Sequence, residues 1–180
     1  QLGQRGTGAA IVLADGFRNP DGKGGNELQR AMLTAARATG MRILGPNCIG
    51  LLLPRIGLNA SFAHTQPIPG RLAFLSQSGA LCTAVLDWAN ARGIGFSSFV
   101  SLGDAADVDF GDLLDYLGSD PDTHGILLYV ESIRHARKFL SAARAASRNR
   151  RVIILKAGRQ PAGAKAAWSH TGALVGKDDV

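Results

Sequence analysis

The segment Leu72-Ala73-Phe74-Leu75-Ser76-Gln77-Ser78-Gly79-Ala80 decides the predicted fold, because an apolar run passes into a polar turn and then into a helical pattern. The apolar residues at its start are typical of a strand that is buried on both faces. The serines and the glycine that follow favour the N-terminus of a helix, with Ser78 as its N-cap. The segment therefore predicts a strand, a turn and a helix in succession.

The same alternation of apolar strands and amphipathic helices runs through most of the chain. The expected strands are residues 9–14, 41–44, 72–75, 96–102, 125–130 and 152–155. The expected helices are residues 27–39, 78–92, 110–117 and 133–147. Because the strands are apolar throughout, we expect an α/β fold in which parallel strands are covered by helices on both faces.

A proline-rich stretch divides this pattern. Residues 53–70 contain Pro54, Pro67 and Pro69 and show little periodicity, which predicts a connection between two domains, 1–69 and 70–180. The chain begins at Gln1 without a methionine and stops shortly after a glycine-rich turn. Both ends are therefore expected to be cut from a longer protein.

Length and composition narrow the class of protein. The 180 residues are 46% hydrophobic, which is enough for a substantial core. No apolar stretch is long enough to cross a bilayer, so no membrane contact is expected. Cys48 and Cys82 form no disulfide framework and lack zinc-ligand spacing, which favours a reducing, cytoplasmic location.

The net charge of +6 points to anionic ligands rather than to nucleic acid. The local basic cluster, Arg144 to Arg151, contains no aromatic residue, whereas single-stranded nucleic acids are bound by interleaved basic and aromatic side chains. Cations at this place are typical of a helix C-terminus, where they complement the dipole. A positive balance also suits nucleotides or coenzyme A.

Polar residues follow directly on the predicted strands, at the edge where parallel sheets bind ligands. They are Asn47, Ser76, Asp104, Glu131 and Lys156. Among them, the turn Ser76 to Ala80 presents unpaired N–H groups at a helix N-terminus, which can bind a phosphate or an oxyanion. It is not a P-loop, because no Gly-Lys-Ser/Thr follows. The alternative is that Ser78 is only an N-cap.

His170 is the candidate nucleophile, because it lies in the glycine-flanked polar loop 169–173 and imidazole is a nucleophile near neutral pH. Glu131 could hold its ring in one tautomer, or could simply be a solvated glutamate at a helix start. Cys48 has no local base or cation to lower its pKa, so a packed turn is favoured there. Asp104, Asp107 and Asp109 lack the glycine and glutamate of an EF-hand loop, and no metal site is predicted.

Taken together, these motifs resemble the NDP-forming acyl-CoA synthetase superfamily, which includes the succinyl-CoA synthetase α subunit and ADP-forming acetyl-CoA synthetases. The resemblance covers essentially the whole chain. It rests on four motifs in this order: Gly45-Pro46-Asn47-Cys48-Ile49-Gly50, Ser76-Gln77-Ser78-Gly79, residues 120–123 before the strand that ends at Glu131, and Ser169-His170-Thr171-Gly172.

The resemblance implies a fold and a chemistry. Residues 1–69 would be the C-terminal part of a Rossmann-like CoA-binding domain, and 70–180 a flavodoxin-like domain. An acyl phosphate would form from acyl-CoA and phosphate, the phosphoryl group would pass to a histidine, and a nucleoside diphosphate would accept it. The implied roles are phosphoryl carrier for His170, ring partner for Glu131, phosphate binding for Ser76, Ser78, Gly79 and Ala80, and the CoA or acyl pocket for Asn47, Cys48 and Asp15.

The resemblance also implies partners. Coenzyme A or acyl-CoA would bind this chain, whereas ATP or ADP and Mg²⁺ would bind an ATP-grasp domain or subunit that these residues do not contain. An oligomer is expected. The fragment alone would therefore not complete a turnover.

A second interpretation stays open. Leu58 to Phe62, Leu86 to Ala89 and Ser141 to Asn149 resemble bacterial proteins in which this module is fused to a GNAT acetyltransferase domain. There the module can serve as an acyl-CoA sensor. A third interpretation, a flavodoxin-like binding fold without chemistry, is opposed by the joint presence of His170, Glu131 and the turn at 76–79.

Overall fold

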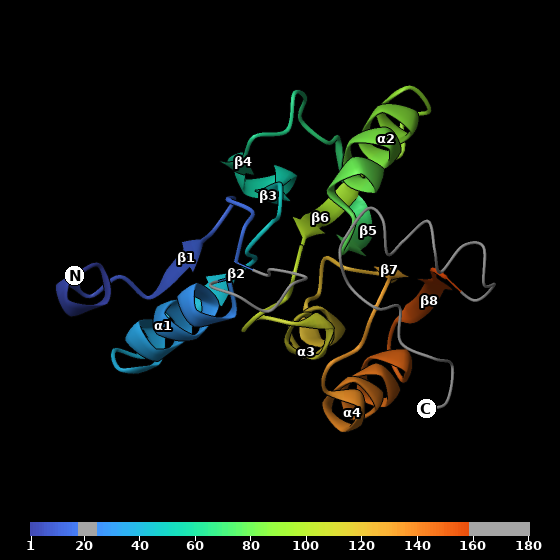
Figure 1. Cartoon of the computed structure of the whole chain (residues 1–180). Helices are drawn as coiled ribbons and strands as arrows, with labels where there is room; N and C mark the ends of the chain where they lie inside the picture. Colours follow the sequence, from blue (N-terminus) through green and yellow to red (C-terminus); the bar gives the residue numbers. More distant parts are fainter. Residues whose placement is uncertain (18–24, 159–180) are drawn as a thin grey trace.

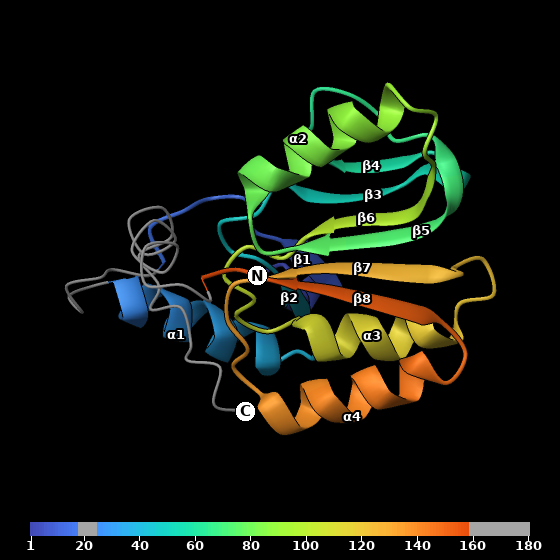
Figure 2. The same cartoon turned by 90° about the vertical axis from the view of Figure 1, so that its right-hand side faces the viewer.

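The computed structural model describes residues 1–17 and 25–158, and a six-stranded sheet forms the centre of this part of the chain. The strands lie in the order β4-β3-β6-β5-β7-β8 (Figure 2). Their bounds are β3 Gly50–Leu53, β4 Leu58–Ser61, β5 Pro69–Ser76, β6 Phe96–Ser101, β7 Gly125–Val130 and β8 Arg151–Lys156. The helices that pack on them are α2 Gly79–Asn90, α3 Phe110–Ser119 and α4 Ala136–Ser147.

The sheet is mostly parallel, which confirms the predicted fold class. β6, β5, β7 and β8 all run in the same direction. α2 covers one face of the sheet, and α3 and α4 cover the other (Figures 1 and 2). The carboxyl ends of the parallel strands therefore share one edge, where the polar residues named above were expected to meet.

One expectation about the chain is wrong. Residues 53–70 were predicted to be an irregular connection, but β3 and β4 form an antiparallel pair, and β3 also pairs antiparallel with β6. A short 3₁₀ turn, Pro54–Ile56, joins the two strands. This hairpin extends the sheet of the second half of the chain, although it lies within the range assigned to the first. The division at residue 69 itself stays a prediction.

Two hydrophobic cores lie on opposite faces of the sheet, and β5 contributes alternate residues to them. Ala73 and Leu75 are completely buried and pack on the side of α3 and α4. Phe74 points to the side of α2, where it packs with Phe96 and Phe99 at ring distances of 6.5 and 5.0 Å. Burial on both faces explains why β5 is apolar without alternation in the sequence.

The first part of the chain forms a smaller unit beside this sheet. β1 (Ala9–Ile11) and β2 (Arg42–Leu44) pair in parallel, and α1 (Gly25–Arg37) lies between them in the chain (Figure 1). A short 3₁₀ helix, Gly3–Arg5, precedes β1. A strand–helix–strand unit of this kind is the building block of Rossmann-like domains. The assignment of residues 1–69 to such a domain remains a prediction.

None of the helices described in residues 1–17 and 25–158 has the length and apolar character that crossing a membrane requires.

Candidate functional site

A pocket of about 250 Å³ opens where the turn after β2 meets the first turn of α2. It brings together two sets of residues for which the sequence predicted different roles. Asn47 and Cys48 come from the turn, and Ser78 to Ala80 come from the start of the helix. Leu13, Ile49 and Phe62 supply its apolar lining. The pocket is therefore polar on its helix side and apolar on the other, and it lies at the carboxyl edge of the parallel strands.

The turn at residues 45–50 is held by backbone hydrogen bonds from both parts of the chain. The Asn47 N–H donates to the carbonyl of Ala14 at 3.0 Å, and the Asp104 N–H donates to the carbonyl of Pro46 at 2.9 Å. Asn47 has φ 57°, which asparagine tolerates better than most residues. Because it is fixed from two sides, this turn keeps Asn47 and Cys48 in place at the pocket.

The first turn of α2 has the geometry of an anion site. The Ser78 hydroxyl accepts a hydrogen bond from the Leu81 N–H at 3.3 Å, so Ser78 is the N-cap that the sequence predicted. Within the described residues, the N–H groups of Gly79 and Ala80 have no acceptor. These two groups and the positive end of the helix dipole face the pocket region, which favours a bound anion.

Ser76 contributes to this turn from inside. It is completely buried, and its hydroxyl donates to the Ser78 carbonyl and accepts from the Ser78 N–H, both at 3.0 Å. Its hydroxyl therefore shapes the turn that precedes α2. Ser76 is not among the residues that line the pocket.

Glu131 lies directly after β7 and is buried, with 9% of its surface exposed. The structure thus contradicts the alternative of a solvated glutamate at a helix start, because α4 begins only at Ala136. Its carbonyl accepts from Lys156 Nζ at 3.1 Å. Burial raises the pKa of the neighbouring Tyr129 hydroxyl, and the charge of Glu131 raises it further. A buried carboxylate therefore stands at the carboxyl edge of the sheet.

Both cysteines are thiols rather than thiolates. Burial, with a contribution from the charge of Asp104, raises the pKa of Cys48 to about 11. Burial raises the pKa of Cys82 to about 12. Cys48 therefore lines the pocket as a small neutral group, in agreement with the expectation that it is not a nucleophile.

Besides Ser76 and Glu131, two further predicted site residues are not brought to this pocket by the described part of the chain. Asp15 is exposed, its side chain accepts from the N–H of Gly16 at 2.6 Å, and it does not line the pocket. His170 lies outside the described residues. The roles of both residues stay predictions.

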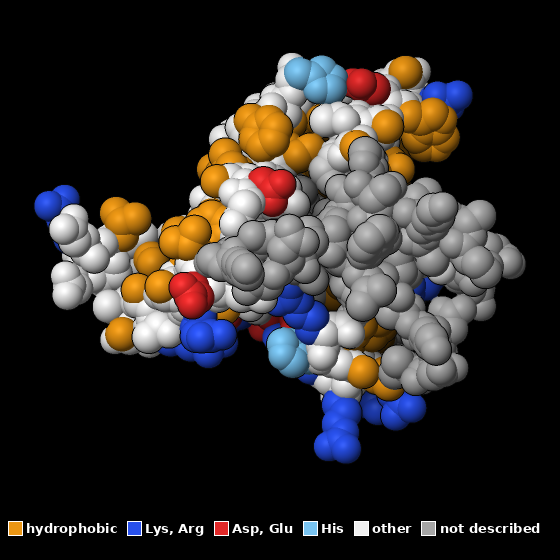
Figure 3. Space-filling view, in the orientation of Figure 1, with side chains coloured by type: hydrophobic (Ala, Val, Ile, Leu, Met, Phe, Trp, Pro, Cys, Tyr) orange, Lys and Arg blue, Asp and Glu red, His pale blue; other side chains and the backbone are white. Residues whose placement is uncertain are grey.

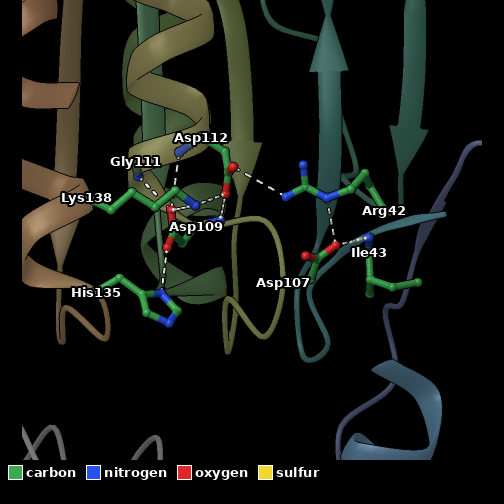
Figure 4. Close-up of polar contacts among 8 residues, drawn as sticks. All are labelled: Arg42, Ile43, Asp107, Asp109, Gly111, Asp112, His135 and Lys138. Carbon is green, nitrogen blue, oxygen red and sulfur yellow. Dashed lines mark hydrogen bonds and ion pairs between the residues drawn. The ribbon is translucent and has the colours of Figure 1, made fainter. Parts of the chain in front are cut away.

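Two of the aspartates that resembled a cation loop, Asp107 and Asp109, make structural contacts (Figure 4). Asp107 pairs with Arg42 at 3.0 Å, and Asp109 caps α3 in a capping box with Asp112. Burial alone would raise the pKa of Asp112, but hydrogen bonds from Lys138, the Asp109 backbone and Arg42 lower it to about 2. These contacts tie β2 to α3 and α4. The described residues contain no group of three or more His, Cys, Asp or Glu side chains that could hold a metal ion.

Charged side chains are dispersed on the face of the molecule that Figure 3 shows. On the face shown in Figure 3, Lys and Arg side chains lie at several separate places, at the far left, near the centre, along the lower edge and at the upper right. The expectation that nucleic acid is not a partner stays a prediction.

One further residue of this region, Gln77, could not be recognised as a site residue from the sequence pattern. Gln77 lines the pocket, and its side-chain oxygen accepts hydrogen bonds from the backbone N–H groups of Glu131 and Ser132 at 2.7 and 3.0 Å. In the sequence, its only distinguishing feature is its position between the two serines of the Ser76 to Ala80 turn.

Comparisons with known proteins point to one family. Residues 69–180 match the model of the succinyl-CoA ligase like flavodoxin domain. The chain is 43% identical over 176 residues to an ADP-forming acetate–CoA ligase of Archaeoglobus fulgidus, covering 98% of this chain and 26% of that protein. It is 42% identical over 180 residues to the α subunit of an ADP-forming acetate–CoA ligase of Pyrococcus furiosus, covering 100% of this chain and 39% of the subunit.

A solved structure agrees with these relatives. The dinucleotide-forming acetyl-coenzyme A synthetase 1 of Candidatus Korarchaeum cryptofilum, in complex with phosphate and ADP, superposes with a TM-score of 0.89 at 40% identity. The match covers 98% of this chain and 38% of that one. The chain thus spans well under half the length of the relatives it matches. None of the relatives named here is an acetyltransferase, so the interpretation as a GNAT-linked sensor gains no support from them.

The family match, the level of identity and the fold agree with one another: the chain belongs to the NDP-forming acyl-CoA synthetase superfamily and carries its succinyl-CoA ligase like flavodoxin domain.

Proposed function

We propose that this chain is the CoA-binding and ligase part of an ADP-forming acyl-CoA synthetase that acts on acetate or a similarly small acid. The observation that carries the proposal is the pocket between the Asn47–Cys48 turn and the first turn of α2. Its N–H groups suit a phosphate, and its apolar wall of Leu13, Ile49 and Phe62 suits a short acyl chain. An acyl phosphate has these same two halves.

The proposed reaction begins with acyl-CoA and inorganic phosphate. A phosphate oxygen attacks the thioester carbonyl, the C–O bond forms and the C–S bond breaks, and CoA leaves as a thiolate that takes up a proton. A ring nitrogen of His170 then attacks the phosphorus of the acyl phosphate. The N–P bond forms as the P–O bond to the acyl group breaks, and the acid leaves with the electron pair. An oxygen of a nucleoside diphosphate finally attacks the phosphorus and releases His170.

The site residues divide these tasks. The N–H groups of Gly79 and Ala80, with the dipole of α2, stabilise the phosphoryl oxygens, while Ser76 and Ser78 shape the turn that presents them. Glu131 accepts the second ring N–H of His170 and stabilises its charge during transfer. Supporting this role is the burial of Glu131 at the edge from which α2 begins.

Other groups act on the substrate or come from elsewhere. Asn47, Cys48 and Asp15 would face the CoA and acyl groups. ADP or ATP and Mg²⁺ would bind an ATP-grasp domain or subunit outside these 180 residues, and an oligomer would assemble around it. In support, two of the relatives from Pyrococcus furiosus are α subunits, and the Korarchaeum structure contains ADP and phosphate.

The test uses the full-length protein together with its nucleotide-binding part. Incubation with ATP labelled at the γ-phosphate and with Mg²⁺ should give an acid-labile, base-stable label on the chain. His170→Ala should abolish the label, whereas His64→Ala, which removes an exposed histidine paired with Asp87, should keep it. A label that survives in the His170→Ala variant would overturn the proposal.

A further inference from the structure

We propose that Gln77 and Lys156 are positioning residues that hold the main chain of Glu131 between the ends of two neighbouring strands. Gln77 follows β5 and Lys156 ends β8, and β7 lies between these two strands in the sheet. The inference rests on the proposed function, in which the carboxylate of Glu131 orients the His170 imidazole. It adds the residues that fix where this carboxylate stands.

Gln77 holds the N–H side of this segment. The parallel register pairs Ser76 with Tyr129, so Gln77 and Glu131 lie just beyond the last paired residues of β5 and β7. The Gln77 N–H still donates to the Tyr129 carbonyl at 3.3 Å. The Gln77 Oε1 atom then accepts from the N–H groups of Glu131 and Ser132 at 2.7 and 3.0 Å. A side-chain amide thus continues the hydrogen bonding where the ladder ends.

Lys156 holds the carbonyl side of the same residue. Its ammonium donates to the Glu131 carbonyl at 3.1 Å and to the Ala157 carbonyl at 2.8 Å. The Ala157 N–H in turn donates to the Val130 carbonyl at 2.9 Å. The peptide groups on both sides of the Glu131 Cα are therefore fixed, each with its N–H bonded to Gln77 and its carbonyl bonded to Lys156 or Ala157.

This arrangement matters because a partner for an imidazole must stand within hydrogen-bond reach, about 2.6–3.2 Å. Glu131 comes after the last residue of β7, so the sheet ladder alone does not fix its position. A displacement of about 1 Å in a reacting site costs on the order of 100-fold in rate. By holding the Glu131 backbone, the two side chains therefore keep its carboxylate in position for phosphoryl transfer.

The competing explanation is that both residues only stabilise the strand ends. Variants of the full-length protein with its nucleotide-binding part distinguish the two, with His170 phosphorylation by ATP followed in single turnovers. Gln77→Met keeps the shape but removes the acceptor, and Lys156→Met removes the donor. Each should slow phosphorylation by about 10- to 100-fold with an unchanged KM for ATP. Lys156→Arg keeps the donor and should recover most of the rate.

A matched control and a double variant complete the test. Gln66→Met changes an exposed glutamine and should leave the rate unchanged. Gln77→Met combined with Glu131→Gln should be no slower than Glu131→Gln alone, because Gln77 acts through Glu131. Additive losses, or normal rates in both Gln77→Met and Lys156→Met, would overturn the inference.

The outcomes separate this inference from the proposed function. If the wild-type protein carries no label at His170, or if Glu131→Gln is as fast as wild type, the proposed function or the role of Glu131 fails. If Glu131→Gln is slow but the Gln77 and Lys156 variants are not, only the positioning inference fails. If Gln77→Met does not fold, Lys156→Met and its rescue by Lys156→Arg still decide the question.

Discussion

The hydroxyl of Ser101, at the end of β6, accepts a hydrogen bond from the backbone N–H of Ile49 at 3.0 Å. Both residues are buried, and the bond joins the central sheet to the turn that carries Asn47 and Cys48. A serine at the end of a buried strand thus fixes one wall of the pocket.

Ser101→Ala should therefore lower stability and loosen the pocket. The change leaves the Ile49 N–H buried without its acceptor, which costs about 1–3 kcal/mol of the free energy of unfolding. Urea unfolding measures this loss. Ser97→Ala is a matched control, because Ser97 is a buried serine of the same strand that bonds to Thr123 away from the pocket. Only Ser101→Ala should also weaken binding of the acyl-CoA substrate; equal binding in the two variants would contradict this.

Substitutions of Ser78, the N-cap of α2, should affect helix stability and anion binding differently. Ser78→Asp keeps a side-chain acceptor for the Leu81 N–H, so the helix should stay capped and the free energy of unfolding should change by less than about 1 kcal/mol. Its negative charge would lie beside the N–H groups proposed for the phosphoryl oxygens. We expect phosphorylation of His170 to fall by at least about 10-fold.

Ser78→Ala is the opposite case. This variant loses the capping hydrogen bond, which lowers the free energy of unfolding by about 1 kcal/mol, but it adds no charge. Phosphorylation should therefore fall less in Ser78→Ala than in Ser78→Asp, while thermal stability should fall more. The reverse order in either measurement would argue against an anion site at this helix start.

Most of the fold follows from the order of apolar strands and amphipathic helices, and the exceptions have physical reasons. β3 and β4 were missed because Gly50–Leu53 and Leu58–Ser61 are short and lie next to Pro54, and because their pairing depends on β6, distant in the chain. β1 ends at Ile11 rather than at residue 14, and the chain beyond it stays beside the end of β2 through hydrogen bonds from the Val12 N–H to the Leu44 carbonyl and from the Asn47 N–H to the Ala14 carbonyl.

Site residues could be predicted where they belong to a local motif. They could not be predicted where their contact depends on the register between two strands. Ser78 as an N-cap and the turn at Asn47 could be predicted from neighbouring residues. The contact between Gln77 and Glu131 spans 54 residues and exists only because Ser76 pairs with Tyr129. A shift of the register by one residue would remove it, and no local pattern encodes that register.

The ion pairs around α3 should make stability depend on pH. The pKa of Asp112 is lowered from 3.8 to about 2, so its ionised form is favoured in the folded state. This contribution, on the order of 2 kcal/mol, is present above pH 4 and is lost as the pH falls towards 2. Asp112→Asn should therefore lower the free energy of unfolding at pH 7 and lose its effect near pH 2. A difference from wild type that stays constant with pH would exclude this cause.

Two glycines with positive φ provide a matched test of how tightly the pocket turn is packed. Gly103 has φ 54°, and a Cβ atom there would overlap the carbonyl oxygens of Pro46 and Asn47. Gly93 has φ 64°, but a Cβ atom there would meet nothing. Gly93→Ala should cost only the left-handed backbone penalty, about 1–2 kcal/mol.

Gly103→Ala should cost this penalty and, in addition, must push the Pro46–Asn47 turn away from β6. We expect its free energy of unfolding to fall by about 2 kcal/mol more than that of Gly93→Ala, in the range of an overpacked core. Because the turn lines the pocket, binding of acyl-CoA should weaken in Gly103→Ala and stay unchanged in Gly93→Ala. Urea unfolding and calorimetric titration measure the two effects, and equal behaviour of the two variants would show that the turn moves freely.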